Sequence, residues 1–270
     1  GTLNNTNAVT FSTGTLAFTN DLTIDGNITM SGNGTIDISD NRTFDYSGNS
    51  FAVGTNTLTL TGGGTLANAN ALTFSTGTIN VDDTMTVSGD ITMSGNGTLD
   101  ISSNETLSYS GASLAVGANT LTFLGGGTLN NTNAVTFSTG TLAFTNDLTI
   151  DGNVTMSGNG TIDISDNRTF DYSGNSFAVG TNTLTLTGGG TLANANALTF
   201  STGTINVDDT MTVSGDITMS GNGTLDISSN ETLSYSGASL AVGANTLTLL
   251  GGGTLNNTNA VTFSTGTLAF

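Results

Sequence analysis

The sequence repeats itself with a period of 126 residues, and this repeat limits the possible folds more than any other feature. The segment GTLNNTNAVTFSTGTLAF begins at Gly1 and returns at Gly127 and at Gly253. The copies 1–126 and 127–252 differ at only two positions. A long period of this kind is typical of repeat proteins, in which each repeat buries its apolar face against its neighbours.

Each copy is itself a doublet. Residues 1–63 and 64–126 match at 40 of 63 positions, and we call these two segments and their later copies half-repeats. Residues 253–270 open a third copy of the long repeat. We therefore expect residues 1–270 to form one continuous array, and we expect the chain to be a window of a longer repetitive protein.

Within each half-repeat, apolar residues occur in pairs separated by one residue. Examples are Val9/Phe11, Leu16/Phe18, Leu22/Ile24 and Ile36/Ile38. Such alternation predicts a strand with one buried face. Clusters of Gly, Asn and Ser lie between the pairs, as at residues 31–34 and 61–64, and these residue types favour tight turns. The absence of proline suits strands whose N–H groups are all needed for pairing.

Nine strands in each half-repeat amount to one strand per seven residues, so a coil of three strands would have about 21 residues. A threonine recurs at this spacing before one apolar pair in each coil, and we expect these threonines to stack in one column: Thr15, Thr35, Thr57, Thr78, Thr98 and Thr120. The sequence therefore predicts an all-β, three-sided parallel β-solenoid (a β-helix) of about 13 coils. Two-sided and four-sided coils are the alternatives, and they would misalign the threonines. The crossover rule for parallel strands favours right-handed coiling.

The alternation also predicts which side chains point inward. The predicted buried set is Phe11, Phe18, Ile24, Ile38, Phe51 and Leu60. The predicted exposed set is Thr10, Thr23, Asp37 and Thr59. A register slip of one residue would exchange the two sets.

Composition excludes several classes of protein. The chain has no Cys and no His, so zinc sites, disulfides and thiol or Ser-His nucleophiles are absent. Arg42 and Arg168 are the only basic residues against 20 acidic ones, and the formal charge is −18. We therefore expect no nucleic-acid partner. Apolar runs are only a few residues long, so we expect no membrane insertion of this segment.

Two segments carry a resemblance to known proteins. Residues 56–66, NTLTLTGGGTL, and residues 32–39, GNGTIDIS, resemble the strand repeats of bacterial autotransporter passengers and of filamentous haemagglutinin-type exoproteins. The resemblance implies a right-handed parallel β-helix, an extracellular or cell-surface location, and a role as an adhesin or a stalk. No functional residue of those families matches a motif here.

Enzymes that cleave polysaccharides need paired carboxylates. The predicted stacking puts Ala17 and Thr59 beside Asp37, and the next Asp of that column, Asp100, lies three coils away. We therefore expect no enzyme. A regular threonine row would also suit ice binding, but Asp37, Asn80 and Asp100 interrupt its neighbouring row, and this argues against ice binding.

One acidic cluster is a candidate metal site. Asp83 and Glu105 each lie two residues before the first apolar residue of a strand, one coil apart, and Asp82 is adjacent. Oxygen ligands suit calcium. The 126-residue repeat brings the candidate back, so its members are Asp82, Asp83, Glu105, Asp208, Asp209 and Glu231. The alternative is a solvated acidic turn. The first half-repeat has Asn20 and Arg42 at the positions equivalent to Asp83 and Glu105.

The sequence as a whole predicts a structural protein, namely a fibre, stalk or sheath component that acts as a rigid spacer and assembles with itself. The alternative is an adhesin whose solenoid face binds surface glycans. Ice binding and action on polysaccharides come third. No cofactor is required, and calcium is the one candidate.

Overall fold

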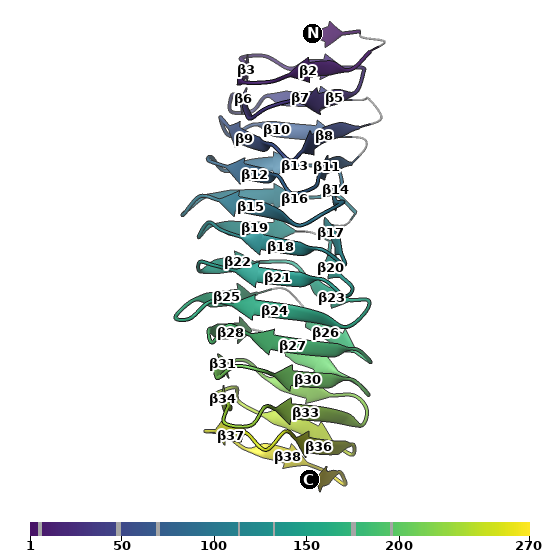
Figure 1. Ribbon diagram of the computed structural model, residues 1–270, viewed down its shortest axis with the longest axis vertical. Coiled ribbons are helices and arrows are strands. Elements are labelled where there is room, and N and C mark those ends of the chain that lie inside the picture. Colours follow the sequence, from purple (N-terminus) through teal and green to yellow (C-terminus); the bar gives the residue numbers. More distant parts are fainter. Residues whose placement is uncertain are drawn as a thin grey trace. The chain divides into compact units, whose positions relative to one another are not determined.

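The computed structural model describes residues 1–4, 7–46, 50–68, 71–112, 114–131, 133–173, 177–194 and 197–270. The chain divides into two compact units, Gly1–Val135 and Thr136–Phe270, and each is described by itself. The regular structure of the described residues consists of strands joined by short turns (Figure 1).

The first unit contains three parallel sheets, A, B and C, and every third strand belongs to the same sheet. The strands of its sheet A are β1 (Thr2–Leu3), β4 (Leu22–Ile24), β7 (Thr43–Tyr46), β10 (Thr65–Asn68), β13 (Met85–Val87), β16 (Thr106–Tyr109) and β19 (Thr128–Asn131). Those of sheet B are β2 (Val9–Phe11), β5 (Ile28–Met30), β8 (Phe51–Gly54), β11 (Leu72–Phe74), β14 (Ile91–Met93) and β17 (Leu114–Gly117). Those of sheet C are β3 (Gly14–Phe18), β6 (Gly34–Ile38), β9 (Thr57–Thr61), β12 (Thr78–Val81), β15 (Gly97–Ile101) and β18 (Thr120–Phe123).

The second unit has the same arrangement, and the division between the units falls within β20 (Val135–Phe137). Its sheet A holds β22 (Leu148–Ile150), β25 (Thr169–Tyr172), β28 (Thr191–Asn194), β31 (Met211–Val213), β34 (Thr232–Tyr235) and β37 (Thr254–Asn257). Its sheet B holds β23 (Val154–Met156), β26 (Phe177–Gly180), β29 (Leu198–Phe200), β32 (Ile217–Met219), β35 (Leu240–Gly243) and β38 (Val261–Phe263). Its sheet C holds β21 (Thr141–Phe144), β24 (Gly160–Ile164), β27 (Thr183–Thr187), β30 (Thr204–Val207), β33 (Gly223–Ile227), β36 (Thr246–Leu250) and β39 (Thr267–Ala269).

The pairing confirms the predicted architecture. Each strand pairs in parallel with the strand three places later, as β4 does with β7 and β31 with β34. One strand from each sheet makes one coil of about 21 residues. Each unit is therefore a three-sided parallel β-solenoid. Right-handed coiling and one continuous array over residues 1–270 stay predictions.

The inward apolar pairs form the core. Phe18, Ile24, Ile38, Phe51 and Leu60 are buried as predicted. Aromatic rings pack inside, with the centroids of Phe144 and Phe170 4.0 Å apart in a stacked arrangement. The prediction for Phe11 is wrong, because its side chain is only half-buried. Its strand, β2, is the first of sheet B and pairs on one side only, with β5.

The prediction of the exposed set is confirmed for Thr10 and wrong for Thr23, Asp37 and Thr59, which are half-buried. These side chains do point outward. Both neighbours of Asp37 and of Thr59 in their strands are buried, and Thr23 precedes the buried Ile24. Strands of successive coils lie only about 4.8 Å apart. An outward side chain is therefore partly covered by the equivalent side chains of the coils on either side.

The predicted threonine column is wrong at two of its steps. Thr15 pairs with Thr35 as expected, but Thr35 pairs with Thr59 and not with Thr57. The same two-residue step places Thr98 opposite Thr122 and not opposite Thr120. As a result Asp37 lies between Ala17 and Thr61, and not beside Thr59.

Asparagine side chains in the turns explain this step. The Asn56 side-chain amide donates to the carbonyl oxygens of Met30 and Val53, each at 3.0 Å. Asn33 Oδ1 then accepts the N–H of Thr57 at 2.8 Å. Because these bonds close the turn after β8 tightly, β9 begins opposite Asn33, two residues earlier than the threonine spacing suggests. Since a shift of two keeps every side chain on its own face, the inward set is unaffected.

Candidate functional site

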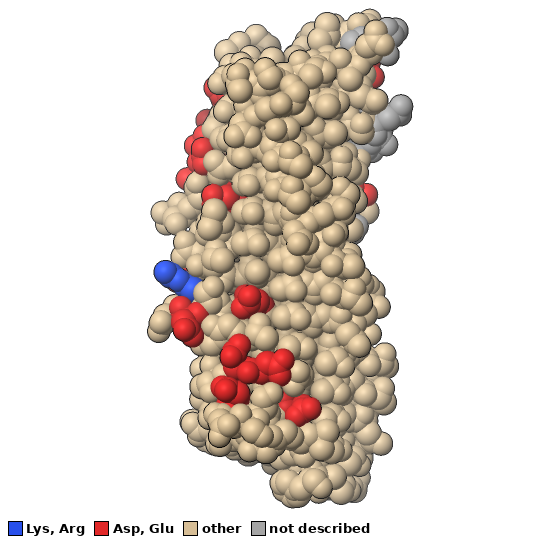
Figure 2. Space-filling view, viewed as in Figure 1, with Lys and Arg blue, Asp and Glu red and all other residues tan. Residues whose placement is uncertain are grey.

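The charged residues of the chain gather where a sheet C strand leads into the next sheet A strand. We call these connections the C–A corner; they are residues 19–21, 39–42, 62–64, 82–84, 102–105 and 124–127, and residues 145–147, 165–168, 188–190, 208–210, 228–231 and 251–253. The corner holds both arginines and ten of the 20 acidic residues: Asp21, Asp40, Asp82, Asp83, Glu105, Asp147, Asp166, Asp208, Asp209 and Glu231. Figure 2 shows acidic side chains concentrated on part of the surface, with large uncharged areas elsewhere.

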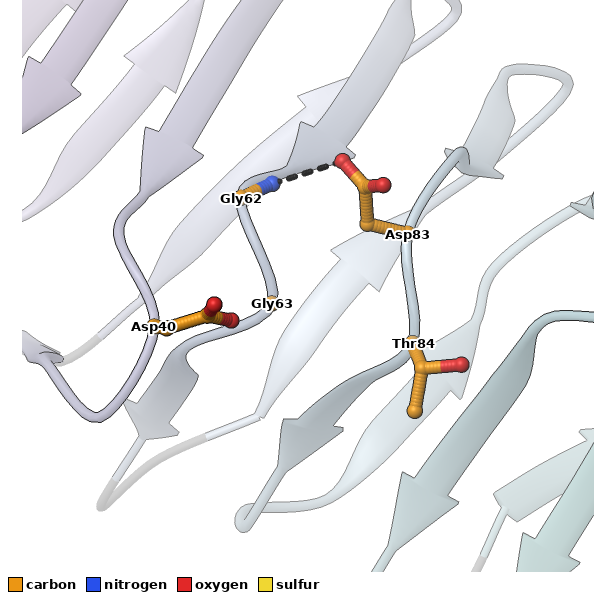
Figure 3. A pocket seen from close by; sticks show the side chains of 5 residues that line it. All are labelled: Asp40, Gly62, Gly63, Asp83 and Thr84. Carbon is orange, nitrogen blue, oxygen red and sulfur yellow. Dashed lines mark hydrogen bonds between the residues drawn. The ribbon is translucent and has the colours of Figure 1, made fainter.

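A shallow hollow of about 290 Å³ lies at the C–A corner of the first unit, lined by Asp40, Gly62, Gly63, Asp83 and Thr84 (Figure 3). The second unit repeats it as a hollow of about 450 Å³ lined by Asp166, Gly188, Gly189, Asp209, Thr210 and Glu231. The five lining residues of the first hollow all return in the second at the 126-residue period, and Glu231 is added there.

The two glycines of the first hollow are needed by its geometry. Gly62 and Gly63 have φ values of +89° and +75°, a region that other residues rarely adopt. A Cβ on Gly62 would lie 2.6 Å from the carbonyl oxygen of Ile38. Asn41 makes the corresponding left-handed turn one coil earlier, with φ 59°. The corner therefore follows from the Gly and Asn clusters of the sequence.

The carboxylate of Asp83 is held by the backbone of the preceding coil. Asp83 Oδ2 accepts the N–H of Gly62 at 2.9 Å, and Asp40 lies on the other side of the glycine turn (Figure 3). The second unit repeats the bond between Asp209 Oδ2 and the N–H of Gly188, also at 2.9 Å. One oxygen of each aspartate is thus used to tie two coils together.

Glu105 is held by a hydroxyl group. Thr84 Oγ1 donates to Glu105 Oε2 at 2.7 Å and accepts the N–H of Thr106 at 3.0 Å. In the second unit Thr210 makes the same two bonds, to Glu231 Oε2 at 2.8 Å and from the N–H of Thr232 at 3.0 Å.

Asp82 and Asp208 also accept from the coil that follows. Ser102 Oγ donates to Asp82 Oδ1 at 3.1 Å, and Ser228 Oγ donates to Asp208 Oδ1 at 2.9 Å. Partial burial raises the pKa of nearby Asp100, and the negative charge of Asp82 raises it further. Like charges of the corner and of the adjoining sheet C strand are therefore held close together.

The sister half of the repeat makes the same connection with different residues. Where the second half has Thr84, the first half has Asp21, and Asp21 Oδ1 accepts the N–H of Thr43 at 2.9 Å. Arg42 occupies the position equivalent to Glu105, and Asn20 that equivalent to Asp83. In both halves, therefore, a side chain of the preceding coil accepts the N–H of the first residue of a sheet A strand.

These contacts bear on the predicted calcium site. The pairing of Met85 with Leu107 places Asp83 and Glu105 on neighbouring coils, as the spacing suggests. Calcium needs six to eight oxygen ligands, but the part of the chain that the structure describes contains no group of three or more acidic side chains arranged to hold a metal. Because protein donors already engage these carboxylates, the geometry favours the alternative of an acidic turn. Calcium binding stays a prediction.

Sequence reasoning did not identify the asparagines of the turns between sheets B and C. The bond in which Asn33 Oδ1 accepts the N–H of Thr57 has three equivalents, each at 2.8 Å. They join Asn96 and Thr120, Asn159 and Thr183, and Asn222 and Thr246. The signal was present as an asparagine that returns at the same place in each half-repeat.

Comparisons with known proteins identify no relative. No family model matches the sequence, and neither a curated protein nor a solved structure matches the chain. Among the described residues there is no helix of the length and apolarity needed to cross a membrane.

Proposed function

We propose that this chain is a structural repeat segment, a spacer that sets length in an extracellular fibre, stalk or sheath. The observation that carries the proposal is the repetition of the contacts themselves. The acidic hollow recurs in both units with five lining residues in common, and the asparagine bond recurs in each half-repeat. A catalytic or recognition site is usually built once, whereas a spacer uses every repeat alike.

The side-chain chemistry supports the same proposal. The polar groups of the corners bond to adjacent coils, either to the backbone, as Asp83 does with Gly62, or to a hydroxyl group, as Glu105 does with Thr84. Buried side-chain polar atoms of the described residues all have partners. A formal charge of −18 keeps the chain away from nucleic acid and favours solubility. The extracellular location rests on the resemblance to autotransporter passengers and haemagglutinin-type exoproteins.

The adhesin alternative requires a surface that binds glycans. Loss of that surface would weaken attachment. The repeat allows a clean test, because removal of residues 64–126 joins Gly63 to Gly127 and restores the sequence Gly-Gly-Gly-Thr-Leu. In the unmodified chain the N–H of Gly64 donates to the carbonyl oxygen of Ile38 at 2.9 Å. In the deletion variant the N–H of Gly127 takes the place of that donor.

The experiment measures folding, length and attachment of this deletion variant. We expect it to fold with the same circular dichroism spectrum and to be shorter by three coils, about 14 Å in small-angle scattering. The variant keeps a near-identical copy of the deleted segment at residues 190–252. A folded variant whose attachment to cells or glycans weakens markedly would therefore overturn the spacer proposal and assign a binding site to this type of half-repeat.

A further inference from the structure

The outer face of sheet B is free of charge in both units. Its strands and the turns that lead from them into sheet C contain no acidic or basic residue. By contrast, sheet C carries Asp37, Asp100, Asp163 and Asp226, and sheet A carries Asp45 and Asp171. Four aspartates, Asp25, Asp90, Asp151 and Asp216, lie in the connections from sheet A to sheet B. The C–A corner, with its ten acidic residues, is the corner that sheet B does not touch.

The face is also regular. The central outward residue of successive sheet B strands runs Thr, Thr, Ala and then repeats, for example Thr73, Thr92 and Ala115. The residue that follows each strand's inward pair runs Ser, Ser, Gly in the same order, as at Ser75, Ser94 and Gly117. Short side chains at every position make this a low and even surface.

Several hydroxyl groups of this face already have an acceptor within the chain. Thr73 Oγ1 donates to the carbonyl oxygen of Phe51, and Thr199 Oγ1 to that of Phe177, each at 3.3 Å. Ser201 Oγ donates to the carbonyl oxygen of Gly180 at 3.0 Å. Burying an unsatisfied hydroxyl costs about 1–3 kcal/mol, so a donor that is satisfied internally lowers the cost of removing water from this face.

Charge decides which partner fits. Two copies of a chain with a formal charge of −18 repel each other, and burying carboxylates against carboxylates costs several kcal/mol per ion. Charges on the far C–A corner are screened beyond about 8 Å at physiological ionic strength, which leaves one aspartate per half-repeat, such as Asp90, at the edge of sheet B. Sheet B is the one face through which copies can approach without bringing acidic residues of the sheets together.

We propose that the outer face of sheet B is the surface through which two copies of this chain associate side by side, sheet B packed against sheet B. Packed sheets lie about 10 Å apart, a distance that Thr, Ala and Ser side chains fill. The proposal rests on the proposed function and names its lateral partner, a second copy of the chain.

The available area predicts how strong the association is. Coils about 4.8 Å apart and four strand residues spanning about 13 Å give about 60 Å² of face per coil. A stable interface buries about 800 Å² on each partner. The six sheet B strands assigned wholly to one unit give less than half of that area, so association should be weak for this chain and should tighten with each added repeat.

The test compares two variants of the full 270-residue chain by sedimentation equilibrium. Thr92→Glu with Thr218→Glu places charge on sheet B, whereas Thr86→Glu with Thr212→Glu places it on sheet A. All four threonines are central, half-buried residues of three-residue strands with buried neighbours, so the pairs are matched. We expect the dimer dissociation constant to rise at least about tenfold in the sheet B variant, equivalent to about 1.4 kcal/mol, and to change much less in the sheet A variant.

Two further measurements keep the proposal open to refutation if a variant folds poorly. In the unmodified chain, added salt should tighten association because it screens like charges. Addition of one further copy of residues 1–126 should tighten it further. A chain that stays monomeric at every salt concentration and repeat number, or that responds equally to both variants, overturns the proposal. So does a monomer that binds a crystalline glycan or ice through sheet B. In each of these cases the spacer function survives if the deletion of residues 64–126 still folds and shortens the chain.

Discussion

Asn33 Oδ1, in the turn before β6, accepts the backbone N–H of Thr57 at the start of β9 in the next coil, at 2.8 Å. This bond fixes where β9 begins and therefore how sheet C is aligned. Because the bond recurs in every half-repeat, one type of polar contact accompanies the two-residue step of sheet C in each of them.

The first prediction concerns this bond. Replacing Asn96 by Ala leaves the N–H of Thr120 without its acceptor, and a hydrogen bond of this kind contributes about 0.5–1.5 kcal/mol. We expect Asn96→Ala to lower the free energy of unfolding by about 1 kcal/mol, measured by urea denaturation. Asn80→Ala, on the half-buried outer face of sheet C, is the control and should change it by less than about 0.5 kcal/mol. Equal effects of the two changes would show that Asn96 has no special role.

Much of the fold follows from the sequence because the paired apolar residues have a period of two. That period alone assigns Ile24, Phe51 and Leu60 to the core, and one strand per seven residues together with a threonine recurring about every 21 residues gives three strands per coil. The alignment of Thr35 with Thr59 could not be predicted in this way, since two registers that differ by two residues bury the same faces. Side chains in the turns choose between them.

The candidate site was predictable to a similar degree. The spacing of Asp83 and Glu105 places them on neighbouring coils, and the pairing of Met85 with Leu107 confirms it. The direction of each carboxylate depends on local donors, the N–H of Gly62 and the hydroxyl of Thr84. Residue spacing carries no information about those donors, so it predicted the closeness of the two acidic residues but not their hydrogen bonds, and calcium binding at this corner stays a prediction.

The second prediction concerns acid pH. Burial raises the pKa of Asp100 and of Asp171, and the charges of Asp82 and Asp151 respectively add to the effect. A carboxyl whose pKa is raised by folding binds its proton more tightly in the folded state. Its favourable contribution is therefore complete below the ordinary value of 3.8 and is lost as the pH rises through the folded-state pKa.

We therefore expect the thermal midpoint to rise as the pH is lowered from about 7 to about 4. The double variant Asp100→Asn, Asp171→Asn should show a flatter dependence over the same range. Melting curves at constant ionic strength measure both. If the thermal midpoint of the double variant changes with pH as steeply as that of the parent chain, these two residues do not cause the pH dependence.

The third prediction concerns metal ions. If the C–A corner is an acidic turn, calcium and magnesium at the same concentration should raise the thermal midpoint alike, because both only screen the charge of the chain. Glu105→Gln with Glu231→Gln should leave that response nearly unchanged, since Gln still accepts from Thr84 and Thr210. A rise specific to calcium that disappears in this variant would instead establish the site predicted from the sequence.

The last prediction concerns the integrity of a single coil. Deleting residues 92–98 removes most of β14, the turn that follows it and the start of β15. The coil then has two sides in place of three, and each later inward pair of the first unit moves onto the wrong sheet. Because a coil gains its backbone pairing only from neighbours in register, this small deletion should be far more damaging than the loss of a whole half-repeat. Urea denaturation and limited proteolysis should show a lower transition midpoint and cleavage near the junction, with the deletion of residues 64–126 as the folded control. A seven-residue deletion that melts like the parent chain would mean that the coils tolerate a missing side, which a three-sided solenoid does not allow.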